Sequence, residues 1–177
     1  MRIIAGKHRG RILTQFQGQE IRPTPDRVKE SLFQILEPCL RGARVLDLFC
    51  GSGALGLECI SRGAKEVVFN DRSRESLAVL KKNLSVLGES GKIYNLDYKA
   101  CLDSVSGKFD LIFADPPYKD TLCAEILSYV KARKLLGKQG IVVYESEREE
   151  TAPEGFTLAD KRSYGRTKIL FFKETEQ

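Results

Sequence analysis

The sequence predicts an α/β fold in which a mostly parallel sheet carries helices on both faces. From residue 44 onward, short apolar runs alternate with segments of helical periodicity, which is typical of repeated strand–helix–strand units. A glycine-rich turn, Gly51-Ser52-Gly53, follows the first of these runs, as at the ligand-binding turns of open α/β sheets. The chain has 177 residues, which is enough for one domain with a small addition.

Composition excludes several classes of protein. Hydrophobic residues make up 42% and charged residues 30% of the chain, which is typical of a globular domain and not of a disordered one. No apolar run approaches the roughly 18 residues that a membrane helix needs. The five cysteines form no CxxC pair, and the first residues lack the apolar core of a signal peptide. We therefore expect a cytoplasmic protein without disulfides, a metal site or a membrane partner.

The front of the chain is predicted to begin with a hairpin. Two short extended runs, 2–5 and 11–13, flank a polar link that contains two glycines, which favours a β-hairpin with a basic tip. Because a lone hairpin is marginally stable, we expect this one to pack against the main body.

A helix is expected to follow the hairpin. Thr24 can act as its N-cap and Pro25 suits the first helical position, and apolar residues then recur at helical spacing. Pro38 should end the helix, because proline lacks the backbone donor that continues it. Residues 1–43 are therefore interpreted as an extension in front of a larger unit, residues 44–177.

The larger unit is expected to contain parallel strands, the helices that connect them, and an antiparallel pair. The strands are predicted at 44–49, 66–71, 93–97, 109–115 and 141–145, and the helices at 54–62, 73–87 and 121–130. The tail differs, because two further runs, 156–162 and 169–173, flank a short link that contains Gly165. We expect these two runs to pair antiparallel and close one edge of the sheet.

The excess positive charge lies in the front quarter of the chain. Lys and Arg number 29 against 24 Asp and Glu, and residues 1–44 hold nine of the basic and four of the acidic side chains. A basic extension on a neutral body suggests a surface for a polyanion, because each neutralised phosphate releases condensed counterions. We therefore expect contacts with nucleic acid from Arg2, Lys7, His8, Arg9, Arg11, Arg22 and Arg27.

An aspartate lies at or near the end of each of the first four predicted strands: Asp47, Asp71, Asp97 and Asp115. The carboxyl ends of parallel strands meet at one edge of the sheet, where open α/β sheets bind ligands. Because neighbouring carboxylates repel one another, four in one row indicate nearby hydrogen-bond donors or a cationic partner.

The turn after the first strand formally matches GxGxxG through Gly51, Gly53 and Gly56, and Asp71 follows at the spacing of a ribose-binding acid. A nicotinamide-dependent dehydrogenase is therefore one interpretation. However, Asp47 precedes the turn, and a carboxylate there suits an ammonium group better than a pyrophosphate. S-adenosylmethionine meets that requirement, because it carries a sulfonium, an amino-acid head and a ribose but no phosphate.

The most discriminating motif is Asp115-Pro116-Pro117-Tyr118, directly after a strongly apolar run. Two prolines stiffen the loop and remove two backbone donors, which leaves its acceptors available. The Asp115 carboxylate and the Pro116 carbonyl can accept the two hydrogens of an exocyclic amine, and Tyr118 offers a ring for stacking on a planar base. This arrangement favours the pyramidal nitrogen that attacks a methyl carbon in line, with Asp115 as the expected proton acceptor.

Segments 47–56 and 115–118, together with Asp71, resemble the class I S-adenosylmethionine-dependent amino-methyltransferases. The front end, 1–10 followed by 22–33, resembles the RsmD family of small-subunit ribosomal RNA guanine-N2 methyltransferases. The resemblance implies a Rossmann-like, seven-stranded, mostly parallel sheet with an N-terminal hairpin and helix. It also implies a guanine of 16S ribosomal RNA, the one numbered 966, as the target during small-subunit assembly.

The same resemblance implies roles for individual residues. The residues that would bind S-adenosylmethionine are Asp47, Phe49, Gly51, Ser52, Gly53, Asp71, Asp97 and Asp115. Among them, the glycine loop would face the methionine part, Asp71 the ribose hydroxyls and Asp97 the adenine amino group. The catalytic loop, Asp115 to Tyr118 with Pro116 and Pro117, would hold the guanine.

Other interpretations stay open. The same chemistry on adenine N6 or cytosine N4 of DNA also uses an Asp-Pro-Pro-Tyr loop, and a non-catalytic RNA-binding assembly factor could retain the fold. Cys50 is expected to be structural, because no base lies near it in sequence. His8, on an exposed tip, is expected to contact an RNA backbone, and Arg166 either reaches the site entrance or serves an ordinary turn. We expect a monomer.

Overall fold

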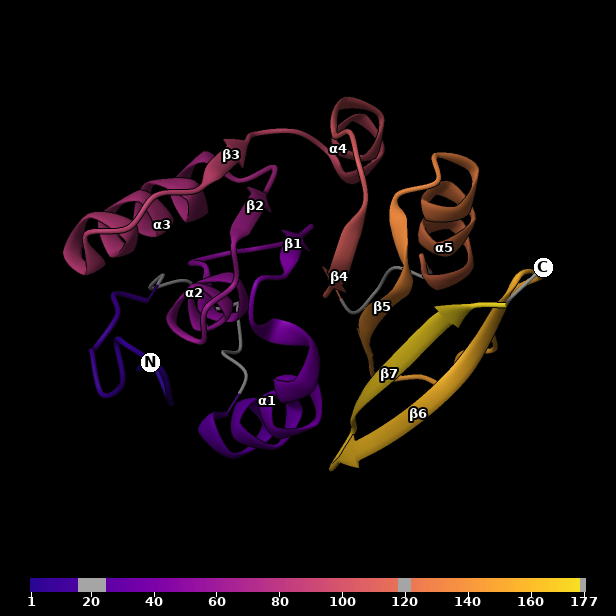
Figure 1. Ribbon diagram of the computed structural model, residues 1–177, viewed down its shortest axis with the longest axis horizontal. Helices are drawn as coiled ribbons and strands as arrows, with labels where there is room; N and C mark the ends of the chain where they lie inside the picture. Colours follow the sequence, from indigo (N-terminus) through magenta and orange to yellow (C-terminus); the bar gives the residue numbers. More distant parts are fainter. Residues whose placement is uncertain (16–24, 118–121, 176–177) are drawn as a thin grey trace.

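A seven-stranded sheet forms the middle layer of the computed structural model, which describes residues 1–15, 25–117 and 122–175 (Figure 1). The strand order is β3-β2-β1-β4-β5-β7-β6. The strands are β1 (Arg44–Asp47), β2 (Glu66–Asn70), β3 (Lys92–Tyr94), β4 (Phe109–Ala114), β5 (Leu136–Ser146), β6 (Phe156–Tyr164) and β7 (Thr167–Glu174). Strands β1 to β5 run parallel, and β7 pairs antiparallel with both β5 and β6. The predicted parallel sheet and the antiparallel pair at one edge are confirmed.

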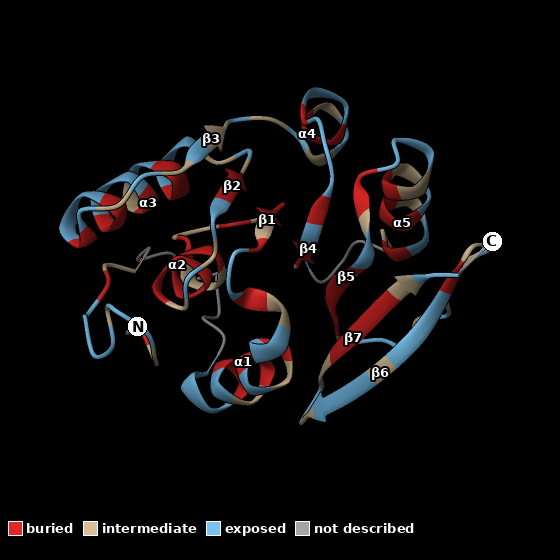
Figure 2. Cartoon of the chain, in the orientation of Figure 1, coloured by how far each residue is buried: buried red, intermediate tan, exposed pale blue. Residues whose placement is uncertain are grey.

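Helices cover both faces of the sheet, as predicted (Figure 1). One face carries α1 (Asp26–Leu40), α2 (Ala54–Ser61) and α3 (Arg74–Leu87), and the other carries α4 (Tyr98–Ser104) and α5 (Cys123–Ala132). Side chains alternate along each strand, so Val45 joins the apolar cluster under α1 to α3 while Leu46 joins the cluster under α4 and α5. Strands β1, β2 and β4 are accordingly buried between two helical layers, whereas β6 is mostly exposed (Figure 2).

The first helix differs from the prediction at both ends. Pro25 is its N-cap and not its first helical residue, and the expected N-cap Thr24 lies outside the described residues. Pro38 lies inside the helix, which continues to Leu40. Leu36 and Leu40, on either side of this proline, are 0% and 1% exposed, and their packing outweighs the one backbone bond that proline removes so close to the end.

The third and fifth strands also differ from the prediction. β3 ends at Tyr94, and the stretch after it folds into α4, a helix that the sequence analysis did not predict. Asp97 starts this helix, because its Oδ1 accepts the backbone amides of Lys99 and Ala100 at 3.0 and 3.1 Å. β5 begins earlier than predicted, because its pairing with β4 continues beyond a break in register near Phe109.

The front extension packs against the body, as expected. A bridge between Arg2 and Ile12 closes the hairpin, and its backbone amides at Ile4 and Ala5 donate to the carboxylate of Glu58 in α2 at 2.9 and 3.0 Å. Lys29 of α1 reaches the same carboxylate at 3.2 Å, and both charged side chains are almost fully buried. Throughout the described part of the extension, the apolar side chains that are buried belong to the cluster under α1 to α3. The hairpin and α1 are therefore built around a buried ion pair with the main body.

None of the helices in the ranges described above has the length and apolar composition to cross a membrane.

Candidate active site

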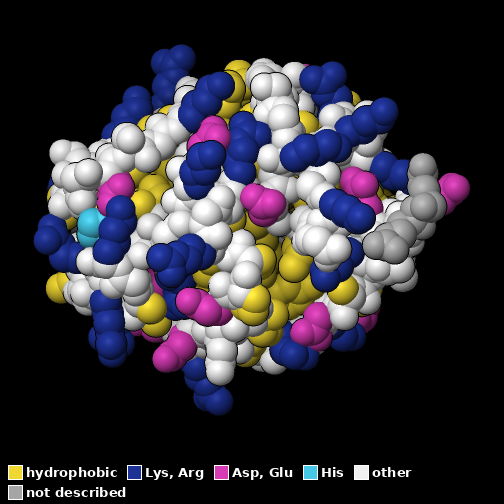
Figure 3. Space-filling view, in the orientation of Figure 1, with side chains coloured by type: hydrophobic (Ala, Val, Ile, Leu, Met, Phe, Trp, Pro, Cys, Tyr) yellow, Lys and Arg dark blue, Asp and Glu magenta, His cyan; other side chains and the backbone are white. Residues whose placement is uncertain are grey.

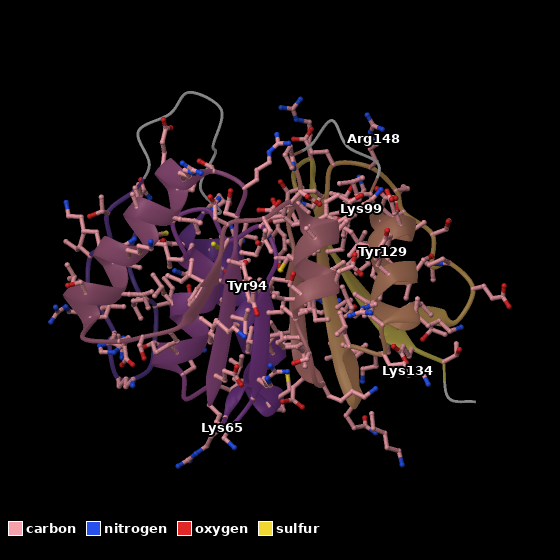
Figure 4. All side chains as sticks on the ribbon, turned by 90° about the horizontal axis from the view of Figure 1, so that it is seen from above. Lys65, Tyr94, Lys99, Tyr129, Lys134 and Arg148 are labelled. Atoms are coloured by element: carbon pink, nitrogen blue, oxygen red, sulfur yellow. The ribbon has the colours of Figure 1, made fainter. Side chains whose placement is uncertain are left out.

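Four carboxylates meet at the carboxyl edge of the sheet, the upper edge in Figure 4, where Arg148 is labelled. Asp47 is the last residue of β1, Asp71 and Asp115 directly follow β2 and β4, and Glu145 lies near the end of β5. The edge on which the sequence predicted a ligand site therefore carries the predicted Asp47, Asp71 and Asp115, and a glutamate that was not predicted.

Three of these carboxylates point to the same face of the sheet. Asp47, Asp115 and Glu145 each lie two positions after a strand residue in the apolar cluster under α1 to α3, so alternation directs each to that side. Asp115 and Glu145 are also neighbours across strands, because Ala114 pairs in register with Tyr144. Burial, and then the negative charges of Glu145 and Asp47, raise the pKa of Asp115 well above its usual range. A cationic ligand beside Asp115 would therefore stabilise its ionised form.

Asp47 is fixed by the helix that follows the glycine loop. Its side chain is buried, and its Oδ2 accepts the backbone amide of Gly56 at 2.9 Å. Burial raises the pKa of this carboxyl to about 7, and the Gly56 bond offsets only part of that effect. A cationic group beside Asp47 would stabilise its ionised form.

The glycines of the loop serve two different purposes. A side chain at Gly51 would meet no atom within 4 Å, so the first glycine borders open space. A Cβ at Gly53 would come within 2.4 Å of Leu80, and one at Gly56 within 2.3 Å of Phe69, so these two glycines allow α2 to pack closely. The start of the loop therefore leaves room for a ligand, whereas Gly53 and Gly56 lie against side chains.

Asp71 closes the open side of that loop. Its Oδ2 accepts the amide of Gly51 and its Oδ1 the amide of Ser73, both at 2.8 Å, so the half-buried carboxylate is held in one orientation. Such a carboxylate keeps further lone pairs for hydroxyl donors. The predicted ribose role of Asp71 fits this geometry.

The remaining predicted cofactor residues lie on the neighbouring elements. Asp97 is exposed, and its hydrogen bonds at the start of α4 account for its position there. The ring of Phe49, two residues past β1, packs on Tyr98 with centroids 5.9 Å apart. The structure thus places an aromatic pair between the end of β1 and the start of α4, on the side where an adenine is expected.

The proline loop is described only in part. Pro116 is buried and Pro117 is exposed, directly after Asp115, whereas Tyr118 lies outside the described residues. Asp47 pairs in register with Phe113, so the Asp115–Pro116 acceptors and the glycine loop leave adjacent strands side by side. An amine bound by Asp115 and Pro116 could therefore meet a group bound at the glycine loop.

The hairpin tip does not lie at this edge. The Lys7 amide donates to the carbonyl of Ser61 at the end of α2, and the side chains of Lys7 and His8 contact Glu89, just past the end of α3. Both helices begin near the carboxyl edge, and eight residues of α2 span about 12 Å, so the tip lies toward the opposite edge. The expectation that His8 is exposed is wrong, because its side chain is 17% exposed and held by Glu89.

The other predicted RNA-binding side chains have varied partners. Arg2 pairs with Asp26 at 3.1 Å, and Arg11 donates to the carbonyl of Val86 at 2.8 Å. Arg9 and Arg27 are exposed, and neither has an ion pair with any of the described residues. Arg22 lies outside the described residues.

Cys50 fits its expected structural role. Its side chain is buried beside the glycine loop, and burial raises the pKa of the thiol well above its usual value. The thiolate required for nucleophilic attack is therefore strongly disfavoured.

Two residues of the site were missed by sequence reasoning. Glu145 could have been found by applying the same strand-end rule to the fifth predicted strand. Asn83 of α3 could not, because its role depends on tertiary contacts: its Nδ2 donates to the carbonyls of Ser52 and Thr14 at 3.0 and 2.9 Å, and its Oδ1 accepts the Thr14 amide. Asn83 thereby joins the glycine loop to the front extension.

Comparisons with known proteins find relatives over nearly the whole chain. A family model described as Conserved hypothetical protein 95 matches residues 1–173. Ribosomal RNA small subunit methyltransferase D of Haemophilus influenzae is 36% identical over 172 residues, which cover 93% of this chain and 89% of that protein. Its namesake in Escherichia coli K12 is 32% identical over 181 residues, covering 100% and 91%. A solved Escherichia coli structure assigned as a methyltransferase superposes with a TM-score of 0.89 at 33% identity, covering 100% of this chain and 99% of that one.

Proposed function

Because the chain belongs to the RsmD family, to which the Conserved hypothetical protein 95 model corresponds, we propose that it methylates the exocyclic N2 of a guanine in 16S ribosomal RNA. S-adenosylmethionine is the methyl donor. The observation that carries the proposal is the placement of the Asp115–Pro116 acceptors beside the open start of the glycine loop, on adjacent strands.

The charge of the site suits this cofactor. Asp47, Asp71 and Asp115 face a loop whose first glycine leaves open space, and this set of carboxylates favours a ligand with an ammonium and a sulfonium group. A dinucleotide would bring its pyrophosphate against the same carboxylates. The residues present therefore fit S-adenosylmethionine and disfavour the dehydrogenase interpretation.

The chemistry needs positioning more than a strong base. S-adenosylmethionine supplies an electrophilic methyl group when it is bound. The Asp115 carboxylate and the Pro116 carbonyl accept the two N2 hydrogens of the guanine and keep the nitrogen lone pair directed at the glycine-loop side. Positioning of this kind can supply roughly 7–11 kcal/mol of the barrier. Asp115 then takes up the released proton, which its raised pKa favours.

The front extension is proposed to contact the RNA backbone through its exposed cations. Arg9 and Arg27 are the clearest candidates, because Lys7, His8 and Arg2 already pair with acidic side chains. Replacing Arg9 with alanine should weaken RNA binding and flatten its salt dependence, with cofactor affinity unaltered.

Incubation of the purified protein with labelled S-adenosylmethionine and 16S ribosomal RNA, followed by mass spectrometry of the fragments, tests the proposal. A labelled guanine N2 in a single fragment is expected. Asp115→Ala should abolish product formation while RNA affinity persists. The control variant Asp103→Ala, at an exposed aspartate of α4, should still form the product. In a parallel incubation with DNA, label on adenine or cytosine, with none on the RNA, would favour the DNA enzyme. Full biological activity of Asp115→Ala would favour an assembly factor.

A further inference from the structure

On the face of the molecule drawn in Figure 3, positive side chains are spread out and do not form one patch. The hairpin tip, which sequence composition singled out, is partly neutralised by Glu89 and lies away from the carboxyl edge. The cations that hold the RNA near the reacting base must therefore be sought next to the Asp115 loop.

Two exposed arginines lie beyond the carboxyl end of β5. Arg148 follows the last residue of β5 by two positions, and Figure 4 shows it at the carboxyl edge, with Lys65 at the opposite edge. Arg166 lies in the turn between β6 and β7, and because Lys168 of β7 pairs in register with Ser146 of β5, that turn also projects from the carboxyl edge. Arg166 therefore belongs to a turn that lies at the same edge of the sheet as the candidate site.

Arg27 of α1 reaches the same edge from the front extension. The Ser31 hydroxyl of α1 is hydrogen-bonded to the hydroxyl of Tyr164, the last residue of β6, and Figure 1 shows α1 beside the β6–β7 turn. Arg27 lies one turn before Ser31 on the same face of the helix. Since α1 runs toward the start of β1, its first turn is the one nearer the carboxyl edge.

These three arginines are available for a ligand. Arg27, Arg148 and Arg166 are exposed, and none of them forms an ion pair within the described ranges. Neighbouring cations differ, because Lys161 pairs with Glu149 at 3.1 Å and Arg162 with Asp160 at 2.8 Å. The unpaired arginines therefore lie at the same edge of the sheet as the carboxylates.

We propose that Arg27, Arg148 and Arg166 form a basic rim that binds the RNA phosphates on either side of the guanine being methylated. This inference rests on the proposed function and assigns its RNA surface. Asp47, Asp115 and Glu145 lie at the same edge of the sheet, and carboxylates repel phosphate in their ionised form. Acidic side chains next to a basic rim favour a base beside the carboxylates and keep its sugar–phosphate backbone on the rim. The rim thus orients an extruded nucleotide as well as attracting the strand.

The test is to replace the three rim arginines with alanine together, with Arg41→Ala and Lys65→Ala as controls. Arg41 and Lys65 are exposed cations without an ion pair among the described residues, and both adjoin the opposite edge of the sheet. RNA affinity is measured against salt concentration, together with kcat, KM and the affinity for S-adenosylmethionine. At about 0.7 per single-strand phosphate contact, the salt slope of the triple variant should fall by about 2.

The expected result is a KM for RNA raised at least about tenfold, with cofactor affinity retained, while both control variants behave as the wild type. Arg166→Glu should weaken RNA binding more than Arg166→Ala, because it adds repulsion at a position where folding does not depend on the side chain. A wild-type protein that methylates RNA, together with an unchanged slope and KM in the triple variant, would overturn the basic rim alone. A wild type that transfers no methyl group to RNA would overturn the proposed function itself.

Discussion

Replacing Asp47 with asparagine should change how the stability of the protein depends on pH. The carboxyl is 3% exposed, and burial raises its pKa from 3.8 to about 7. Asparagine keeps an oxygen that can accept the Gly56 amide and removes the titrating charge. The variant therefore isolates the free energy of ionising one buried carboxyl.

The sign and size of the effect follow from proton linkage. A carboxyl with a higher pKa in the folded state takes up a proton on folding, so it lowers stability progressively as pH rises from its unfolded to its folded pKa. The interval from 3.8 to about 7, at about 1.4 kcal/mol per pKa unit, corresponds to about 4 kcal/mol. The penalty is absent below about pH 4 and complete above about pH 7.

Urea denaturation of both proteins at a series of pH values measures this effect. The stability of the wild type relative to the Asp47→Asn variant should fall by roughly 2 kcal/mol between about pH 5 and about pH 7. Taking the difference cancels the titration of every other group that the substitution does not affect. A difference that stays constant over this range would refute the reasoning, because it would mean that Asp47 is already ionised throughout.

Three further predictions concern buried polar groups. Glu145→Gln should move the rising limb of the plot of kcat/KM against pH to lower pH, because removing the negative charge of Glu145 lowers the pKa of Asp115. A rising limb at the same pH in both proteins would refute this coupling. Asn83→Leu should destabilise the protein by about 2–4 kcal/mol and weaken S-adenosylmethionine binding, because the Ser52 carbonyl of the glycine loop loses its donor. Melting curves measure the stability and calorimetry measures the affinity. An unchanged affinity would contradict the role of Asn83 in holding the glycine loop. Glu58→Gln should lower the free energy of unfolding by about 3 kcal/mol, because it leaves the buried Lys29 without its counter-charge. The control Glu37→Gln removes a carboxylate that is 62% exposed and should lower it by less than about 1 kcal/mol. Urea denaturation measures both values, and equal losses would contradict the argument.

The sheet could be predicted because its pattern is local. Apolar runs bounded by turns marked the strands, and Gly165 marked the antiparallel return, so strand order remained the main unknown. The helix after Asp97 was missed because it has only seven residues, too few for a clear period, and its capping aspartate was interpreted only as a ligand.

The candidate site was predictable to the extent that it follows strand ends. Asp47 and Asp115 lie together because parallel strands end at one edge, and Glu145 obeys the same rule. The environment of the hairpin tip was not predictable, because His8 contacts Glu89 across 81 positions of sequence. Composition located the positive charge along the chain, and only the tertiary structure separates neutralised cations from available ones.

The anchoring of the hairpin has a consequence for the order in which the chain folds as it is made. Ile4 bonds to Glu58, Thr14 to Asn83 and His8 to Glu89, at separations of 54, 69 and 81 residues. Synthesis proceeds from the N-terminus, so these first residues leave the ribosome long before their partners exist. The segment that is translated first is therefore among the last to reach its native contacts. A nascent chain arrested before residue 89 should leave its amino-terminal residues open to proteases, even where β1 and β2 have already paired.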